Sequence, residues 1–256
     1  MTTLEPLYPV ILALFAAAAT GLVGSFALMK KMTLAGDTMS HIALPGLGIA
    51  LIWNINPVIG ATAALAIGAV IIWKIQEKTD LAAETAIGVI FSASIAVGAL
   101  ITPSEEIIEA LFGGESAISL GTLLIYIGLS LLVMLFIWRY RDELILSLFN
   151  ADLATTTGVS VSRLNLGYLL VFALTLILGL RFLGTLLVGA LVIVPAATAR
   201  QLTESLPRFL AGSALLSMLS VGLGYLASNV YGLQVGPTVV SIAAAFFLLS
   251  LLKKRR

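Results

Sequence analysis

Residues 120–138, LGTLLIYIGLSLLVMLFIW, form a run of 19 residues with no charged side chain. A helix needs about 20 residues to cross a hydrocarbon core of about 30 Å, so this run is long enough for a membrane span. Its apolar residues are continuous rather than alternating, which favours a helix over a strand of a β-barrel. The stretch therefore predicts a transmembrane helix.

Comparable apolar runs recur along the whole chain of 256 residues, which is 60% hydrophobic and 11% charged and has a mean hydropathy of +1.11. A soluble domain carries about 25% charged residues, so this composition excludes one. In lipid every backbone polar group has to be satisfied internally, and a helix achieves this within one segment. We therefore predict an all-α fold, a polytopic transmembrane helical bundle that forms a single domain over residues 1–256.

Charges, prolines and glycines mark the ends of the expected spans. The spans fall at 9–29, 38–53, 57–73, 85–102, 120–138, 164–180, 185–199, 207–228 and 238–252. The spans 38–53 and 185–199 are short, and the latter is either a full crossing or a re-entrant segment. The predicted number of crossings is therefore eight or nine.

The basic residues predict the orientation, because short cytoplasmic loops carry an excess of Lys and Arg. With nine crossings and an external amino terminus, all of the 14 Lys and Arg residues except Arg181 fall on the cytoplasmic side. The carboxyl terminus is then cytoplasmic. We expect the first apolar run to be a retained helix, because it has neither a preceding basic segment nor a small-residue cleavage site.

The residues that the chain lacks exclude several chemistries. It contains no cysteine, so a disulfide framework, a thiolate metal site and a cysteine nucleophile are ruled out within it. It also has no phosphate-binding loop of the type GxxxxGK followed by Ser or Thr. We therefore expect no enzymatic activity in this chain. If ATP drives transport, a separate subunit hydrolyses it.

Two connecting segments are long enough for a role of their own, and the first is the expected external loop 103–119. It carries Glu105, Glu106, Glu109 and Glu115 and no Lys or Arg, while its apolar residues recur at helical spacing. Such a segment is either a solvated connecting helix or an acidic surface that attracts cations or docks an external partner.

The second is the expected cytoplasmic loop 139–163, which contains the run NADLATTTGV at 150–159. We interpret this run as a short helix capped by Asp152 and ended by Gly158. A capped, exposed helix between two spans offers a partner protein a rigid contact. The alternative is an ordinary loop helix.

Residues 36–46, GDTMSHIALPG, place the only histidine of the chain, His41, four residues after Asp37. Residues four apart lie on one face of a helix, so a carboxylate and an imidazole would share one location. A rise of about 1.5 Å per residue from the boundary at Lys31 puts His41 about 15 Å deep, near the bilayer midplane. Ionisable groups at that depth usually face a cavity or pathway. The alternative is that Asp37 caps the helix and His41 makes one buried hydrogen bond.

The pair Asp37 and His41 is a candidate metal site. Carboxylate plus imidazole suits Zn²⁺, Mn²⁺ or Fe²⁺ and lacks the sulfur expected for Cu⁺. Two ligands per chain are too few for a closed tetrahedral zinc site. This shortage favours an ion in transit, held by the pair together with water, backbone carbonyls or a second chain. In a twofold dimer the pair would appear twice.

Pro45 follows His41 by four residues, so it removes the backbone donor that would normally bond the His41 carbonyl. Together with Gly46 it predicts a kinked or broken helix with an exposed carbonyl beside the pair. Many transporters form their substrate sites at such interrupted helices. The alternative is a simple packing kink.

Three stretches carry a resemblance to a known family. They are residues 36–46, GDTMSHIALPG, residues 86–94, AIGVIFSAS, and residues 184–200, GTLLVGALVIVPAATAR. In this order they resemble the permease subunits of ATP-binding-cassette importers for zinc, manganese and iron. The likeness covers essentially the whole chain.

The resemblance implies a homodimeric, multi-pass permease in a prokaryotic inner or cytoplasmic membrane. It implies two cytoplasmic ATPase subunits and an external solute-binding protein that delivers the metal, with no nucleic-acid partner and with lipid around the bundle. Asp37 and His41 match the residues that line the metal path in that family. The segment that matches the family's coupling helix, which fits into the ATPase, comprises Asp152, Leu153, Ala154, Thr155, Thr156, Thr157 and Gly158.

The expected function is ATP-driven uptake of a divalent transition metal, with zinc ahead of manganese and iron. The metal is cargo, and no permanently bound cofactor is expected. Imidazole favours zinc, whereas the carboxylate suits manganese nearly as well. One alternative is a proton- or ion-coupled secondary transporter in which Asp37 and His41 relay protons. Another is a membrane scaffold that transports nothing, in which apolar residues could replace the pair.

Overall fold

The computed structural model describes residues 7–32, 34–79, 81–101 and 119–252, and within these residues all regular structure is helical. The predicted all-α fold is confirmed for this part of the chain. The helices are α1 (Tyr8–Met29), α2 (Ala35–Ser40), α3 (Ala43–Ile52), α4 (Pro57–Lys78), α5 (Ala83–Ile101), α7 (Leu120–Phe149), α8 (Ala151–Thr156), α9 (Val161–Leu202), α10 (Leu206–Tyr231) and α11 (Val235–Ser250).

Six stretches of these helices are long and apolar enough to cross a membrane. They are α1, α4, α5, α7, the first limb of α9 (Val161–Leu180) and α10. The remaining predicted spans correspond to shorter helices. They are the apolar helices Leu187–Leu202 and α11 and the interrupted pair α2 and α3. The chain is thus a multi-pass membrane protein, while its number of crossings and its orientation stay predictions.

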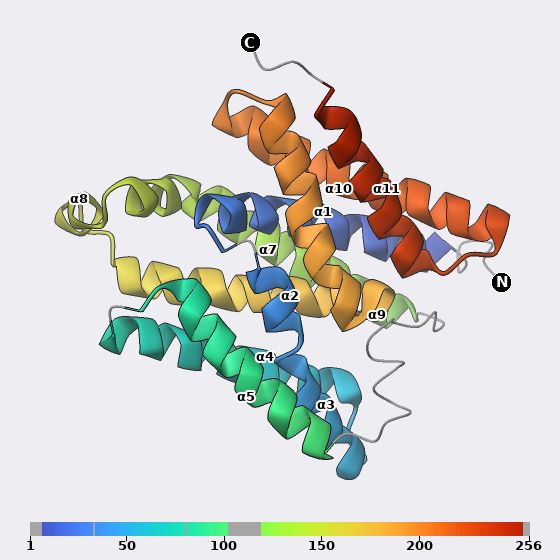
Figure 1. Ribbon diagram of the computed structural model, residues 1–256, viewed down its shortest axis with the longest axis horizontal. Helices are drawn as coiled ribbons and strands as arrows, with labels where there is room; N and C mark the ends of the chain where they lie inside the picture. Colours follow the sequence, from blue (N-terminus) through green and yellow to red (C-terminus); the bar gives the residue numbers. More distant parts are fainter. Residues whose placement is uncertain (1–6, 33, 80, 102–118, 253–256) are drawn as a thin grey trace.

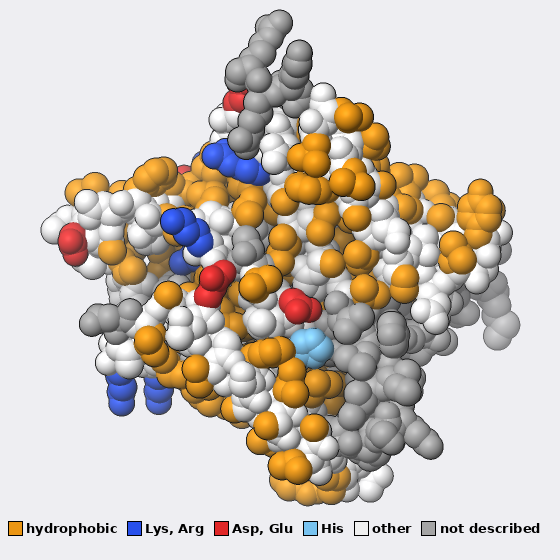
Figure 2. All heavy atoms as spheres, in the orientation of Figure 1, with side chains coloured by type: hydrophobic (Ala, Val, Ile, Leu, Met, Phe, Trp, Pro, Cys, Tyr) orange, Lys and Arg blue, Asp and Glu red, His pale blue; other side chains and the backbone are white. Residues whose placement is uncertain are grey.

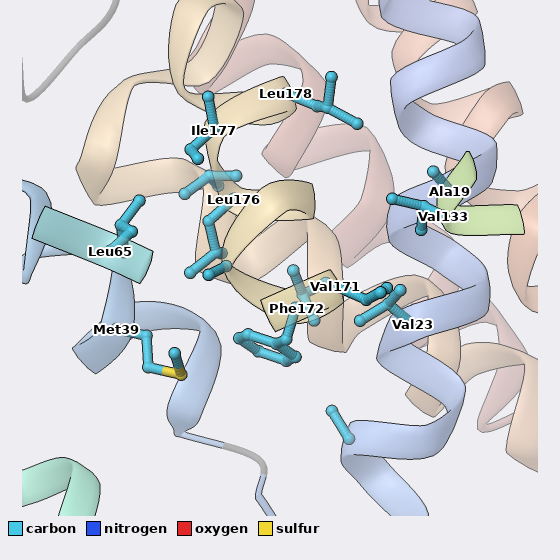
Figure 3. Close-up of a cluster of buried hydrophobic side chains, with 14 of the residues drawn as sticks. Ala19, Val23, Met39, Leu65, Val133, Val171, Phe172, Leu176, Ile177 and Leu178 are labelled. Atoms are coloured by element: carbon cyan, nitrogen blue, oxygen red, sulfur yellow. The ribbon is translucent and has the colours of Figure 1, made fainter. Parts of the chain in front are cut away.

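Helices α1 and α9 form the centre of the bundle. Helix α1 packs against α7, α9 and α10, and α9 also packs against α2, α4 and α11. Figure 1 shows α1, α7 and the first limb of α9 running along the long axis of the molecule. The buried apolar cluster in Figure 3 joins α1, α2, α4, α7 and α9 through Ala19, Val23, Met39, Leu65, Val133, Val171, Phe172, Leu176, Ile177 and Leu178.

Small residues let these helices approach closely, as is common where lipid removes the hydrophobic drive for helix association. A Cβ atom on Gly24 of α1 would collide with the backbone oxygen of Val192 on α9. The adjoining contact with α10 includes a hydrogen bond of 2.6 Å from Ser213 Oγ to the carbonyl of Gly21. Backbone proximity and buried polar bonds therefore hold α1 in place.

Helix α9 is sharply bent, although its helical assignment is continuous from Val161 to Leu202. A Cβ atom on Gly179 would collide with the side chain of Val188, which a straight helix would hold about 13 Å further along its axis. Figure 1 shows the change of direction between the two limbs. The two spans predicted at 164–180 and 185–199 are therefore two limbs of one helix rather than separate helices joined by a loop.

Helix α7 continues beyond its predicted end at Trp138 as far as Phe149. The charged residues from Arg139 onward do not stop the helix, and Arg139 forms an ion pair of 3.1 Å with Glu143 one turn later. The first part of the expected loop 139–163 is therefore helical. The charges mark where an apolar span ends, which is a different boundary from the end of the helix.

The close contact between α3 and α4 gives a test of this packing. A Cβ atom on Gly46 would collide with the backbone of Gly60, and the reverse holds for Gly60. We expect Gly60→Ala to separate the two helices and to destabilise the protein by roughly 1–3 kcal/mol, which thermal unfolding in detergent would measure. The control is Gly128→Ala on α7, where an added Cβ has no neighbour within 4 Å. Equal stability of the two variants would contradict the contact.

Candidate metal site

The helix that carries the candidate ligands is interrupted at His41 and Ile42, between α2 and α3. Pro45 has no backbone N–H, so the His41 carbonyl accepts instead from the N–H of Leu44, at 3.1 Å. The predicted interruption is present. As expected, the His41 carbonyl lacks its usual donor four residues later, and the tighter turn to Leu44 gives it a different one.

Asp37 lies in the first turn of α2 and its side chain is exposed. The N-cap is Leu34, and no side chain caps the helix, so the alternative that Asp37 serves as the cap is wrong. An added Cβ on Gly189 of α9 would lie 2.5 Å from the backbone nitrogen of Asp37. The backbone of Asp37 therefore packs against α9, while the residue remains exposed.

His41 is half-buried in the break between the two helices. Its Nδ1 atom is buried and has no hydrogen-bond partner among the described residues. The imidazole lies against Phe91 of α5, with ring centroids 5.7 Å apart and ring planes tilted by 60°. Figure 2 shows the histidine at the molecular surface with an acidic side chain beside it. The structure therefore brings a carboxylate and an imidazole to one face.

A closed metal site is not formed by this pair alone. Within the described residues, no group of three or more His, Cys, Asp or Glu side chains could hold a metal ion. No hydrogen bond or ion pair between Asp37 and His41 is found in that part of the chain. Any metal bound here would need further donors, such as water, backbone carbonyls or a second chain.

Helix α8 lies at one end of the molecule, as Figure 1 shows, and its ends are both capped. The N-cap is Asn150, whose Oδ1 accepts from the N–H of Leu153 at 2.9 Å. The prediction that Asp152 caps the helix is wrong by two residues, because the side chain of Asn150 already accepts the hydrogen bond from the N–H of Leu153. Asp152 lies in the first turn, where a carboxylate complements the helix dipole.

The predicted end of α8 at a glycine is confirmed. Gly158 has φ +86° and follows the C-cap residue Thr157. The N–H of Val159 bonds the carbonyl of Ala154, and that of Gly158 bonds the carbonyl of Thr155, both at 3.0 Å, which is the Schellman arrangement. Ala154 is buried while Leu153 is 50% exposed. The helix is therefore held on one side and free on the other.

The expected acidic loop 103–119 lies outside the described residues, except for Ser119. Ser119 is the N-cap of α7, and its Oγ accepts from the N–H of Thr122 at 3.2 Å. The role proposed for the four glutamates of this loop therefore stays a prediction.

A polar cluster that the sequence did not indicate joins the end of α1 to α4 and α9. Lys30 Nζ donates to Asn165 Oδ1 at 3.1 Å, and Asn165 Nδ2 donates to Gln76 Oε1 at 2.6 Å. Lys30 Nζ also lies 5.1 Å from the centre of the Tyr168 ring. Desolvation by burial lowers the pKa of Lys30 from 10.5 to about 8.

A second set of bonds joins α4 and α9. Trp73 Nε1 donates to Ser162 at 3.0 Å, and Ser162 Oγ donates to Glu77 Oε1 at 2.8 Å. Ser162 is the second residue of α9, only a few residues after α8. The start of α9 is therefore tied to α4, and through Lys30 to the end of α1.

Sequence reasoning also missed Phe91. The available signal was its place within the stretch AIGVIFSAS, at helical spacing from Ile87 and Gly98, which are both buried. That spacing indicates one packed face of α5, but it cannot tell which helix the face meets.

An all-helical, apolar bundle with an ionisable pair at a broken helix is typical of a multi-pass membrane transport protein. The sequence matches the ABC 3 transport family over residues 5–254. The chain therefore belongs to the ABC 3 transport family. The resemblance to permease subunits of metal-ion ABC importers is confirmed.

Relatives with named substrates are similar over almost the whole chain. Over 257 residues the chain is 30% identical to the high-affinity zinc uptake system membrane protein ZnuB of Haemophilus influenzae, covering 95% of this chain and 98% of the relative. Over 235 residues it is 32% identical to the manganese transport system membrane protein MntC of Halalkalibacterium halodurans, covering 90% and 80%. Both relatives are named as membrane proteins of metal uptake or transport systems.

A solved structure has the same fold. PsaBC from Streptococcus pneumoniae, in complex with Fab, contains a chain that superposes with a TM-score of 0.81 at 28% identity. The match covers 94% of this chain and 89% of that one.

The cap of α8 yields a test. We expect Asn150→Ala to weaken α8 by roughly 0.5–2 kcal/mol, because the N–H of Leu153 loses its acceptor. Hydrogen–deuterium exchange of residues 150–158 should then be faster. Asn150→Asp keeps an acceptor oxygen and should exchange like the wild type. Unchanged exchange in Asn150→Ala would contradict the capping bond.

The half-buried amine of Lys30 gives a pH dependence. Folding lowers the pKa of Lys30 from 10.5 to about 8, so the folded state holds this proton less tightly than the unfolded state. This group therefore adds stability as the pH rises from 8 towards 10.5. We expect the melting temperature of the wild type to rise over this range relative to that of Lys30→Met. Parallel curves for the two proteins would show that Lys30 has an ordinary pKa.

Proposed function

We propose that this chain is the membrane permease subunit of an ATP-driven importer that carries a divalent transition metal into the cell. The observation that carries this proposal is the exposed carboxylate of Asp37 beside the imidazole of His41, at a helix break within an apolar bundle. Charged side chains in membrane segments are costly in lipid and usually line a substrate pathway. In this view Asp37 and His41 are transient ligands of the metal, and Pro45 and Gly46 maintain the break.

The exposure of Asp37 supports a homodimer. Figure 1 places α2 near the middle of the long axis, where a carboxylate on the outer face of one chain would meet lipid. A second copy related by a twofold axis would cover this face and bring a second Asp37 and His41 to it. The two pairs would supply four protein ligands to one path.

The ligand set favours Zn²⁺, with Mn²⁺ and Fe²⁺ as further substrates. Imidazole is a preferred ligand of zinc, and a neighbouring carboxylate is compatible with all three ions. The zinc and manganese transport relatives support this range of cargo. The metal would be released rather than stored, because each chain contributes only two ligands.

The exposed helix α8 supports contact with a separate ATPase. The segment 152–158 consists of most of α8 and its C-terminal cap, which hold Leu153 outward on a rigid turn. We place two ATPase subunits against this surface on the cytoplasmic side of a prokaryotic inner membrane. An external solute-binding protein would deliver the metal to the opposite side.

The proposal is tested in proteoliposomes that contain the permease, its ATPase and its binding protein. Zinc and manganese uptake are measured in competition, with and without ATP. ATP-dependent accumulation of a divalent metal is the expected result. Accumulation that needs no ATP and collapses with an uncoupler would instead identify a secondary transporter.

Removing either candidate ligand should stop transport. We expect Asp37→Ala and His41→Ala each to lower ATP-dependent uptake by at least roughly tenfold, since even a partner of a metal ligand typically contributes that much. Gel filtration should show normal assembly for both variants. The control is Thr62→Val on α4, which removes a hydroxyl bonded within its own helix to the carbonyl of Val58. Wild-type uptake in both ligand variants would exclude the pair from the pathway.

A further inference from the structure

One face of α5 is packed against the break between α2 and α3. Ile87 is 1% exposed, Gly98 is buried, and Phe91 lies between them at helical spacing. An added Cβ on Gly98 would lie 3.1 Å from the side chain of Leu44 and 3.6 Å from Pro45. The same face that reaches the start of α3 at Gly98 therefore presents Phe91 to His41, two turns earlier along α5.

Among the described residues, no hydrogen bond fixes the orientation of the His41 imidazole. A histidine that binds a metal usually donates its other ring N–H to a carboxylate, a carbonyl or water. Here Nδ1 is buried without a partner among the described residues, so that usual support is missing there. The contact that remains is the ring of Phe91, at a centroid distance of 5.7 Å and a tilt of 60°. Tilted aromatic pairs are favourable at separations of about 4.5–7 Å.

We propose that Phe91 is a positioning residue for the substrate metal. Its ring holds the imidazole of His41 with Nδ1 turned into the protein, so that Nε2 is the nitrogen presented at the exposed face to the metal. This inference rests on the proposed function of His41 as a ligand. Phe91 acts through His41 and does not contact the ion.

The arrangement suits an ion that has to leave again. A hydrogen bond from Nδ1 to an acceptor would raise the basicity of the ligand and strengthen its hold on the metal. Packing against an aromatic ring fixes the direction of Nε2 without that effect. The site therefore combines a defined ligand geometry with weak binding of the metal, and an ion that passes through a membrane needs both.

The single histidine of the chain makes this inference directly measurable. The full-length permease is labelled with ¹⁵N-histidine, placed in lipid nanodiscs and titrated with Zn²⁺, and the two ring nitrogens of His41 are followed by NMR. In the wild type we expect Zn²⁺ to shift Nε2 to the metal-bound position while Nδ1 keeps its proton. A merely structural contact would not select one nitrogen.

Variants of α5 separate the role of the ring from a general effect on folding. We expect Phe91→Ala to give metal-bound signals at both nitrogens and to weaken Zn²⁺ affinity by roughly tenfold or more, the loss typical of an indirect ligand partner. Phe91→Tyr keeps the ring and should behave like the wild type. The matched control is Val89→Ala on the same helix, where the native side chain is 56% exposed.

The outcomes distinguish this inference from the proposed function. Selective binding at Nε2 that persists with full affinity in Phe91→Ala would overturn the role of Phe91 alone. Binding of Zn²⁺ at Nδ1 in the wild type would overturn the assigned orientation. If neither nitrogen of the wild type responds to Zn²⁺, His41 is not a ligand, and both the metal site and this inference fail.

Discussion

The close approach of α2 to the second limb of α9 is the contact on which the candidate site depends. Neither Gly36 nor Gly189 has a side chain, so the backbone of α2 can lie directly on α9. Although its backbone takes part in this contact, Asp37 remains exposed. A side chain at Gly189 would displace the backbone nitrogen of Asp37 and, with it, the geometry of the pair.

The bend in α9 makes this contact possible. The first limb of the helix packs beside α1 and α4, and the second limb returns to meet Gly24 of α1 and Gly36 of α2. Helix α8 leads directly into the first limb, and the bonds from Ser162 and Asn165 tie that limb to α4. Helix α9 therefore connects the exposed helix α8 with α2, the helix that carries Asp37.

The sequence was sufficient for features that depend on local chemistry. Long apolar runs identify helices in lipid, Pro45 predicts a break in the helix after His41, and Gly158 predicts the end of α8. These follow from backbone hydrogen bonding within a few residues. Features that depend on distant contacts were not predictable, such as the continuity of α9 through its bend and the meeting of Phe91 with His41. The α8 cap was assigned to Asp152 instead of Asn150. Both residue types are good N-caps, so the sequence alone does not decide at which of them the helix begins.

Polar bonds between distant helices also constrain how the protein is made. Ser213 and Gly21 are 192 residues apart in the chain, and Lys30 and Asn165 are 135 apart. Helix α1 precedes α9 and α10 in the chain, yet most of its contacts are with these two later helices. Because helices in a membrane insert before they associate, α1 can complete its packing only after α9 and α10 have been inserted. Assembly of the bundle, and with it the seat for α2, is therefore a late event in biogenesis.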